Sequence, residues 1–273
     1  MIKKYNILFC ILITISSVFG QSNTPKINRG VLDLRGYDFS ENIPLKGEWE
    51  FYWNKLLDFN DFENSVYSPD AYLNVPGPWN KVQVNEELIP DTGFCTYRLV
   101  IFVNPREKER FMLRFGEILT AYKVWWNEEL IVEVGEVSKN SEGALPAVTP
   151  ILKTVNLETE KIQLIVQVSN YNHRSNSFFD TPVLGRETKV LRSSSLKFFA
   201  DTIIFGALLI MALYHLGLFL LRYKNKAALA FFLLALVVSF RVFVSNNYLL
   251  SFIFPNTSWE FMYRAAYFTY YAM

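Results

Sequence analysis

Hydrophobic residues follow two different patterns along the chain. In the first part, apolar and polar side chains alternate in short runs, such as residues 97–103 (YRLVIFV), 111–115 (FMLRF) and 162–168 (IQLIVQV). Alternation with a period of two is typical of β-strands that pack one face against a core and leave the other face polar. From residue 202 onward, the apolar residues form nearly continuous runs instead. The pattern predicts a β domain followed by apolar helices.

Short turn signals separate the strands of the predicted β domain, at residues 76–78 (PGP), 91–93 (DTG), 104–105 (NP) and 141–143 (SEG). Glycine, proline, asparagine and aspartate supply the backbone conformations that tight turns require. No convincing amphipathic helix competes over this part of the chain, and strands do not alternate with helices as they do in parallel sheets. The sequence therefore predicts an all-β sandwich or jelly roll over residues 21–191.

Residues 202–221 (TIIFGALLIMALYHLGLFLL) carry no formal charge. Twenty helical residues cover roughly 30 Å, which is the thickness of the hydrocarbon core of a bilayer. The alternative is a buried helix of a soluble protein, which seldom needs an apolar run on every face. We predict a transmembrane helix here. Residues 192–201 form a short polar connector, so a movement of the β domain could pass directly into this helix.

A second transmembrane helix is predicted over residues 227–245, after a basic loop at residues 222–226 (RYKNK). Near its outer end, the long side chain of Arg241 can reach the interface. Because basic loops stay in the cytoplasm, the β domain lies outside. Residues 246–258 then form an outer loop, and residues 259–273 begin a third transmembrane helix that stops after about four turns. We interpret the chain as a fragment or a truncated product.

The N-terminus resembles a secretory signal peptide. Residues 1–20 (MIKKYNILFCILITISSVFG) begin with basic side chains, continue with an apolar segment and end in small residues that allow cleavage after Gly20. An uncleaved anchor is the alternative, whereas a lipoprotein anchor is disfavoured because Cys10 lies inside the apolar stretch. In either case, the segment that follows is exported.

Composition and charge exclude several classes of function. The net charge of +1 gives no concentrated basic face for nucleic acid. Of the two cysteines, Cys10 and Cys95, the exported domain keeps one, so it forms no internal disulfide and no cysteine-based zinc site. His173 and His215 lie far apart in sequence, which disfavours a histidine-rich metal site or a Ser-His-Asp triad. We expect no catalytic residue, no metal and no cofactor.

Aromatic side chains near turns are candidate ligand-binding residues. Trp79 follows a Pro-Gly-Pro turn, and it either forms a stacking platform for the apolar face of a sugar or folds back onto the sandwich. Trp125 and Trp126 are neighbours in a predicted strand, so one of them faces the core and the other points outward. Asn127 then lies at the turn, and we include Trp125 and Asn127 among the candidates.

The densest polar loop of the domain follows a strong strand, at residues 170–176 (NYNHRSN). Its amides, imidazole and guanidinium are donors of the kind that binding sites on loops use. The alternative is turn chemistry, in which asparagine side chains satisfy nearby backbone groups. The candidate binding residues in this loop are Asn170, Tyr171, His173 and Arg174.

Polar residues inside the predicted membrane helices form a second set of candidates: Tyr214, His215 and Arg241. An intramembrane polar residue is a functional hypothesis by default. For Tyr214 and His215 the alternative is an interhelical hydrogen bond, which contributes about 0.6 kcal/mol on average. For Arg241 the alternative is snorkelling toward the outer interface.

Several stretches of the chain carry a resemblance to a known family. They are GVLDLR (30–35), LKGEWEFYW (45–53), VPGPW (75–79), TYRL (96–99), AYKVWWN (121–127), QVSNYNHR (167–174) and GALLIMALYH (206–215). In order and spacing these motifs resemble bacterial seven-transmembrane receptors with diverse intracellular signalling modules. The outer domain of that family is a jelly roll similar to the sugar-binding domain of β-glucuronidase-type hydrolases, which implies a galactose-binding-like fold here.

Two loops depart from the family's pattern. The chain has Asn127-Glu128 where the family usually has Asn-Gly, and Asn176-Ser177 where Gly-Gly tends to follow the Asn-His-Arg stretch. Both departures fall at possible ligand loops, so the identity of a ligand does not carry over from the family.

The resemblance implies a receptor in the bacterial inner (cytoplasmic) membrane, with its N-terminal domain outside the cytoplasm. We expect the β-sandwich to sense a small ligand, with carbohydrate as the first candidate class, and to signal to a helical bundle in membrane lipid. The family's remaining spans and its cytoplasmic signalling module are absent from this sequence. Two alternatives stay open: a membrane-anchored glycosidase-like enzyme, which needs two carboxylates about 5 to 9 Å apart, and an envelope protein-docking module.

Overall fold

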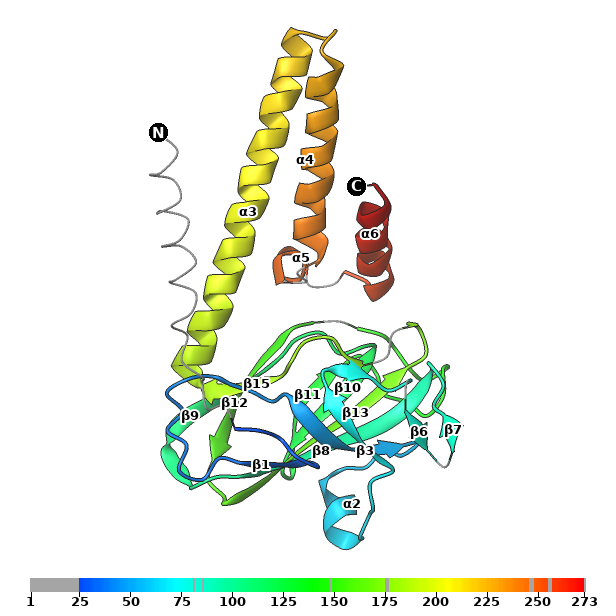
Figure 1. Cartoon of the computed structure of the whole chain (residues 1–273), viewed down its shortest axis with the longest axis vertical. Helices are drawn as coiled ribbons and strands as arrows, with labels where there is room; N and C mark the ends of the chain where they lie inside the picture. Colours follow the sequence, from blue (N-terminus) through cyan, green and yellow to red (C-terminus); the bar gives the residue numbers. More distant parts are fainter. Residues whose placement is uncertain are drawn as a thin grey trace, which may run out of the picture.

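In the computed structural model, a two-layer β-sandwich forms one end of the molecule and long helices extend away from it (Figure 1). The structure describes residues 25–80, 82–84, 86–147, 149–174, 177–245, 248–254 and 257–272. The predicted signal peptide, residues 1–20, lies outside the described residues.

The larger sheet has seven strands. Its order is β11 (Glu129–Val134), β10 (Ala121–Trp126), β13 (Lys161–Asn170), β8 (Gly93–Phe102), β3 (Gly47–Trp53) and β4 (Ala71–Val75), with β1 (Val31–Asp33) parallel to β8. β13 and β8 pair along their full length of ten residues each, so they form the centre of this sheet.

The smaller sheet has four strands, and the first long helix starts at the end of one of them. Its order is β12 (Ile151–Leu157), β9 (Arg106–Phe115), β15 (Val183–Arg186) and β2 (Ile43–Pro44). Two short ribbons pair β14 (Ser177–Phe178) with β5 (Gly77–Pro78) and β6 (Gln83–Val84) with β7 (Glu87–Leu88). β15 lies between β9 and β2 and leads directly into α3, so the long helix starts from the interior of a hydrogen-bonded sheet.

The hydrophobic core lies between the two sheets and is rich in aromatic rings. Trp49 and Phe51 of β3 are fully buried, as the shared face of these alternate residues predicts. Phe51 meets Tyr97 of β8 edge to face, with ring centroids 5.1 Å apart. Such pairs add about 0.5–1.5 kcal/mol beyond the area that they bury. The structure confirms the predicted all-β sandwich followed by apolar helices.

The outer face of the larger sheet is covered, which the alternating pattern does not predict. Gln163 and Gln167 of β13 are only 3% and 7% exposed. The helix α2 (Phe59–Asn64) covers this face, and Gln163 Nε2 donates a 2.7 Å hydrogen bond to Glu63. The Arg98 guanidinium lies 4.4 Å from the ring centroid of Phe62. Gln163 and Arg98 have partners on α2 and on neighbouring strands, which offsets the cost of burying their polar groups.

α2 corrects the expectation that residues 21–191 contain no helix. It has six residues, which is less than two turns and too short for a helical hydrophobic period to appear. A capping box starts it, because the side chains of Asp58 and Asp61 each accept a hydrogen bond from the other residue's backbone amide.

α3 (Glu187–Leu221) is one uninterrupted helix of 35 residues. At 1.5 Å per residue it is about 52 Å long, roughly 20 Å longer than the hydrocarbon core of a bilayer. Residues 192–201, the predicted polar connector, are part of this helix. The chain therefore runs from the sandwich to the far end of the predicted span without a break.

α4 (Lys226–Ser245) returns antiparallel to α3 (Figure 1). Both helices are long and apolar enough to cross a membrane, and only 6% of the apolar stretch of α3 and 22% of that of α4 is buried inside the protein. A core helix of a soluble protein would be mostly buried, so this alternative does not fit. Phe205 and Phe243 pack between the two helices with ring centroids 5.3 Å apart.

Two further helices bring the chain back to the sandwich. The sequence predicts an outer loop over residues 246–258, whereas the structure places α5 (Tyr248–Ile253) within it. α6 (Trp259–Ala272) follows and packs against α4. Leu250 of α5 is buried in one cluster with Val244, Met262 and Leu119, the last of which belongs to the sandwich. Apolar contact with the sandwich therefore accounts for a helix where loop residues are expected.

Candidate functional site

Trp79 does not form an exposed platform. Its side chain is fully buried, and its Nε1 donates a 3.0 Å hydrogen bond to the carbonyl oxygen of Pro90. Its ring also packs against Trp53, with centroids 5.7 Å apart. Stacking on a sugar needs an open ring face, so the structure overturns the platform hypothesis and supports the alternative in which Trp79 folds back onto the sandwich.

The two neighbouring tryptophans of β10 take opposite directions, as predicted. Trp126 is 6% exposed and its Nε1 donates a 2.9 Å hydrogen bond to Asn156, whereas Trp125 is half-buried on the other face. Asn127 has a φ of +52°, a conformation that asparagine tolerates better than most residues. Its Oδ1 accepts a 2.8 Å hydrogen bond from the amide of Gln163, so Asn127 shapes the turn.

Asn170 is fully buried and stabilises its own loop. Its Nδ2 donates hydrogen bonds of 3.2 Å to the carbonyl of Asp91 and 2.7 Å to that of His173. Its Oδ1 accepts a 3.1 Å hydrogen bond from the amide of His173. Asn170 therefore satisfies nearby backbone groups of its own turn, which is the alternative that the sequence left open. Tyr171 is half-buried and Arg174 is exposed, and both stay candidates for ligand contact.

His173 reaches from this loop to the helices. Its ring centroid lies 4.8 Å from that of Tyr263 and 6.4 Å from that of Trp259, both on α6. Its Nε2 lies 3.5 Å from the hydroxyl of Tyr267. The sequence marks His173 as a polar loop residue, and only the fold brings it against the helical part.

Glu117 makes a second contact between the sandwich and α6. The hydroxyl of Tyr263 donates a 2.5 Å hydrogen bond to Glu117 Oε1. Burial raises the pKa of the Glu117 carboxyl, and the hydrogen bond from Tyr263 lowers it. Two smaller effects are the charge of Asp180, which raises this pKa, and that of His173, which lowers it. The net pKa is above its ordinary value, so the site disfavours the ionised form.

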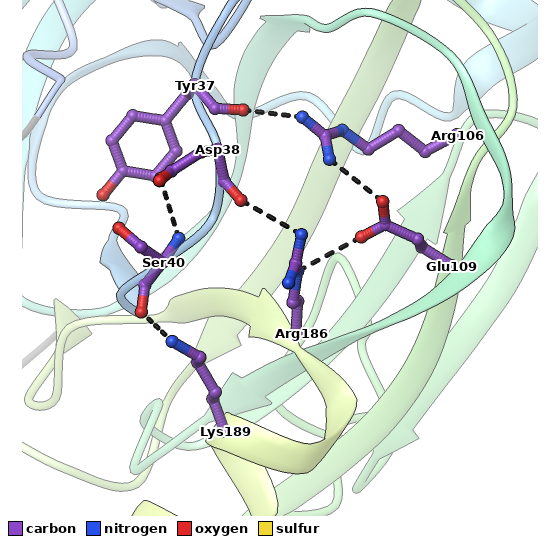
Figure 2. Close-up of polar contacts among 7 residues, drawn as sticks. All are labelled: Tyr37, Asp38, Ser40, Arg106, Glu109, Arg186 and Lys189. Atoms are coloured by element: carbon purple, nitrogen blue, oxygen red, sulfur yellow. Dashed lines mark hydrogen bonds and ion pairs between the residues drawn. The ribbon is translucent and has the colours of Figure 1, made fainter.

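The base of α3 is held by a polar network, which Figure 2 shows. Arg186 ends β15, and its Nε lies 3.1 Å from Glu109 Oε2 while its Nη2 donates a 3.2 Å hydrogen bond to the carbonyl of Asp38. The other oxygen of Glu109 accepts a 3.0 Å hydrogen bond from Arg106. Arg106 Nη2 donates in turn to the carbonyl of Tyr37 over 2.8 Å.

The first turn of α3 adds further links to the same region. Lys189 donates a hydrogen bond to the carbonyl of Ser40 (Figure 2). Glu187 pairs with Arg110 Nε at 3.1 Å and accepts a hydrogen bond from Thr154 at 3.3 Å. Exposed ion pairs contribute only about 0–1 kcal/mol each. Together, however, they fix the direction in which α3 leaves the sheet.

Two of the polar residues of the membrane helices, Tyr214 and His215, are neighbours on α3 with ring centroids 5.3 Å apart. Tyr214 is 62% exposed on α3. His215 Nδ1 lies 2.9 Å from the carbonyl of Met211, one turn earlier, and its ring centroid lies 5.4 Å from that of Phe231 on α4. His215 therefore bonds within its own helix and packs against the neighbouring one.

Arg241 faces α6. Its Nη1 donates a 3.5 Å hydrogen bond to the carbonyl of Ala266, and its guanidinium lies 5.6 Å from the ring centroid of Tyr270. The contact differs from free snorkelling, because the charge is held between two helices rather than extended toward water.

Residues 197–273 match the family described as 7TM diverse intracellular signalling. The similarity to this family covers the helical part of the chain. The match starts within α3 and covers α4, α5 and α6, the helices in which the two apolar stretches lie. It confirms the resemblance for the helical part, where the motif at residues 206–215 lies.

The solved structures that are similar to this chain include two β-glucuronidases and a β-galacturonidase. Faecalibacterium prausnitzii β-glucuronidase shares 17% identity with a TM-score of 0.41, over 54% of this chain and 32% of the enzyme. Ruminococcus gnavus β-glucuronidase shares 15% identity with a TM-score of 0.40, over 54% of this chain and 29% of the enzyme. A GH2 β-galacturonidase from Eisenbergiella tayi shares 15% identity with a TM-score of 0.36, over 54% of this chain and 24% of the enzyme. The chain thus spans a third or less of these enzymes. No curated protein matched the chain.

Several residues that join the sandwich to the helices carry no recognisable sequence signal. Glu117 and Tyr263 are 146 positions apart, and neither stands in a recognisable motif. Glu109 and Arg186 lie on neighbouring strands, so only the strand order brings their charges together. A charged residue at a strand end is normally solvated, and sequence alone does not distinguish it from an anchoring residue.

Proposed function

We propose that the chain is a membrane-bound signal-transduction receptor that senses a small extracytoplasmic ligand through its β-sandwich and passes the signal to the helical bundle. The observation that carries this proposal is the unbroken path from β15 into α3, whose apolar stretch is long enough to cross a membrane. A helix anchored at its base moves as a rigid rod, so a shift in the sandwich changes the arrangement of the bundle.

A polar cleft on the sandwich supports ligand sensing. It has a volume of about 210 Å³ and is lined by Trp126, Asn127, Thr154 and Asn156, among others. The amide and hydroxyl groups of this cleft suit the hydroxyls of a sugar. We therefore keep a carbohydrate as the first candidate class of ligand. Trp125, Tyr171 and Arg174 remain candidate contacts elsewhere on the domain.

We place the protein in the bacterial inner membrane with the sandwich outside the cytoplasm. The basic residues Arg222, Lys224 and Lys226 support this orientation, because they cluster at the α3–α4 turn, at the end of the hairpin away from the sandwich (Figure 1). A cytoplasmic signalling module would receive the output. We assign no catalysis to the chain, and turnover of an aryl glycoside that is abolished by a single glutamate substitution would overturn that assignment.

The test is a distance measurement on the full chain in lipid nanodiscs. Spin labels at Ser141→Cys, an exposed sandwich loop, and Asn225→Cys, the α3–α4 turn, report their separation by pulsed electron resonance while cell-wall and plant oligosaccharides are titrated. Cys10 is replaced by serine in these variants, and Cys95 is fully buried and does not label. We expect one oligosaccharide to bind and to shift the distance.

Ser195→Pro tests whether α3 carries the signal. Proline inside a helix costs about 3 kcal/mol and breaks it. We expect binding to persist in this variant and the shift to disappear, while Ser195→Ala at the same exposed position keeps both. If no oligosaccharide binds, the carbohydrate assignment fails. If one binds and the distance stays constant, the receptor proposal fails.

A further inference from the structure

A second cleft lies where the sandwich meets α4 and α6. Its volume is about 240 Å³, slightly below the range of about 300–1,000 Å³ for sites that hold drug-sized ligands. It is lined by side chains from three separate parts of the fold, including Glu117, His173, Phe179, Arg241, Tyr263 and Tyr267. It shares no lining residue with the cleft beside Asn127.

One end of this cleft is acidic. Glu117 is mostly surrounded by protein, and the hydrogen bond from Tyr263 uses one of its oxygens. A protonated amine adds the attraction between opposite charges to its hydrogen bond, so it can displace the neutral hydroxyl of Tyr263 from Glu117. Asp180 lies near enough to repel the Glu117 charge. A cation bound here would relieve both the burial of the carboxylate and this repulsion.

Aromatic rings line the middle of the cleft. Phe179 and His173 from the sandwich face Tyr263 and Tyr267 from α6, and the centroids of His173 and Phe179 are 6.5 Å apart. The faces of aromatic rings attract ammonium groups, by about 0.5–2 kcal/mol for each favourable contact. The combination of ring faces and a carboxylate favours an amine over a neutral polar group.

The other end of the cleft is basic. Arg241 lies beside Ala266 and the ring of Tyr270. Tyr270 is seven residues after Tyr263, so the basic end is up to about 10 Å further along α6 than the acidic end. The bond to Ala266 is 3.5 Å long and uses one nitrogen of a guanidinium that offers five N–H donors. The remaining donors suit an anionic group.

We propose that this cleft binds a small zwitterion, with its protonated amine at Glu117 and its anionic group at Arg241. Free amino-phosphates and the headgroups of amine-bearing phospholipids share this chemistry. The cleft lies at the sandwich end of the membrane helices, where either source can reach it. The amine competes with Tyr263 for Glu117, so occupancy loosens the contact between the sandwich and α6. The binding stands by itself, whereas its effect on signalling rests on the proposed function.

The test uses the full chain in phosphatidylglycerol nanodiscs and O-phosphoethanolamine as the probe, with binding followed by saturation-transfer NMR. We expect the probe to bind, and ethanolamine or inorganic phosphate alone to bind at least ~10-fold more weakly, because each half loses one charge-assisted contact. Glu117→Gln and Arg241→Gln should each weaken binding by at least ~10-fold. Failure of the probe to bind the unaltered protein overturns the proposal.

Matched variants separate the site from general damage. Glu260 and Arg264 form an exposed ion pair on α6, outside the cleft, so Glu260→Gln and Arg264→Gln should leave the affinity unchanged. Tyr263→Phe removes the competing hydroxyl and should tighten binding, a gain that misfolding does not produce. Equal binding by Glu117→Gln and the unaltered protein would overturn the assignment.

Nanodiscs that contain phosphatidylethanolamine distinguish the two sources. If the lipid headgroup occupies the cleft, O-phosphoethanolamine binds more weakly in the nanodiscs that contain phosphatidylethanolamine, and the lipid is the ligand. If its binding is the same in both kinds of nanodisc, a free zwitterion is the ligand. The distance between Ser141→Cys and Asn225→Cys is measured in the same samples. Probe binding without a change in that distance supports the cleft and counts against the signalling role alone.

Discussion

Burial separates residues that shape the sandwich from residues that are free to bind. Trp79 and Asn170 are both fully buried, and their polar atoms bond to nearby backbone. Trp125 and Arg174 keep accessible surface. Residue type alone did not distinguish these pairs, because a tryptophan or an amide at a turn is equally suited to packing and to binding.

Trp79→Ala should strongly destabilise the protein. It removes a fully buried ring and a hydrogen bond, a class of change that costs about 3–5 kcal/mol. Trp125→Ala, at a half-buried position on the outer face, should cost much less. Thermal unfolding of the full chain in detergent, followed by near-UV circular dichroism, measures both. Similar losses in the two variants would contradict the burial that the structure shows.

Glu117→Gln should stabilise the protein at neutral and higher pH. Burial raises the pKa of the Glu117 carboxyl, so the folded protein holds this proton more tightly than the unfolded chain. The contribution of this proton to the stability of the folded protein is fully present below the pKa of the unfolded chain. It is lost as the pH rises through the pKa of the folded protein. Glutamine never ionises and still accepts the bond from Tyr263, so its variant avoids the loss.

The measurement for Glu117 is the melting temperature of the full chain between pH 4 and pH 8, compared with Glu117→Gln. We expect the variant to melt higher at pH 8 and the difference to shrink as the pH approaches 4. Glu260→Gln, at an exposed carboxyl, should show no such trend. A higher melting temperature for the unaltered protein at pH 8 would argue against a costly buried carboxylate.

The helices show most clearly which elements can be predicted from a local sequence pattern and which cannot. The apolar runs of α3 and α4 are long enough for their period and length to mark them as spans. α2 and α5 have six residues each, and their helical state depends on the surfaces that they cover. The first turns of α3 are polar, so the sequence suggested a connector where the structure continues the helix.

Arg186→Gln should loosen the base of α3 with little loss of stability. It removes the ion pair with Glu109 and weakens the link to Asp38, contacts that contribute about 0–1 kcal/mol each at an exposed site. A spin label at Ser195→Cys should become more mobile in this variant. Arg35→Gln removes an exposed pair with Asp33, away from α3, and should leave the label unchanged. Equal mobility in all three proteins would show that the network does not anchor the helix.

For the whole molecule, the arrangement of charge predicts the orientation in the membrane. A membrane-impermeant maleimide should label Ser141→Cys in intact spheroplasts and Asn225→Cys only after permeabilisation, because the basic turn stays inside. Buried Cys95 gives little background. The reverse pattern of labelling would place the sandwich in the cytoplasm and overturn the proposed sensing role.

The β domain, the two apolar helices and the family resemblance could be predicted from the sequence, because they depend on local periods, run lengths and short motifs. The burial of Trp79 and the contact between Glu117 and Tyr263 could not be predicted and are seen only in the folded protein. The same is true of Arg241, which faces α6 rather than the interface. Such contacts join residues that are distant in the chain or on separate helices, and the energy that forms them depends on how the sheets and helices pack, which no local pattern contains.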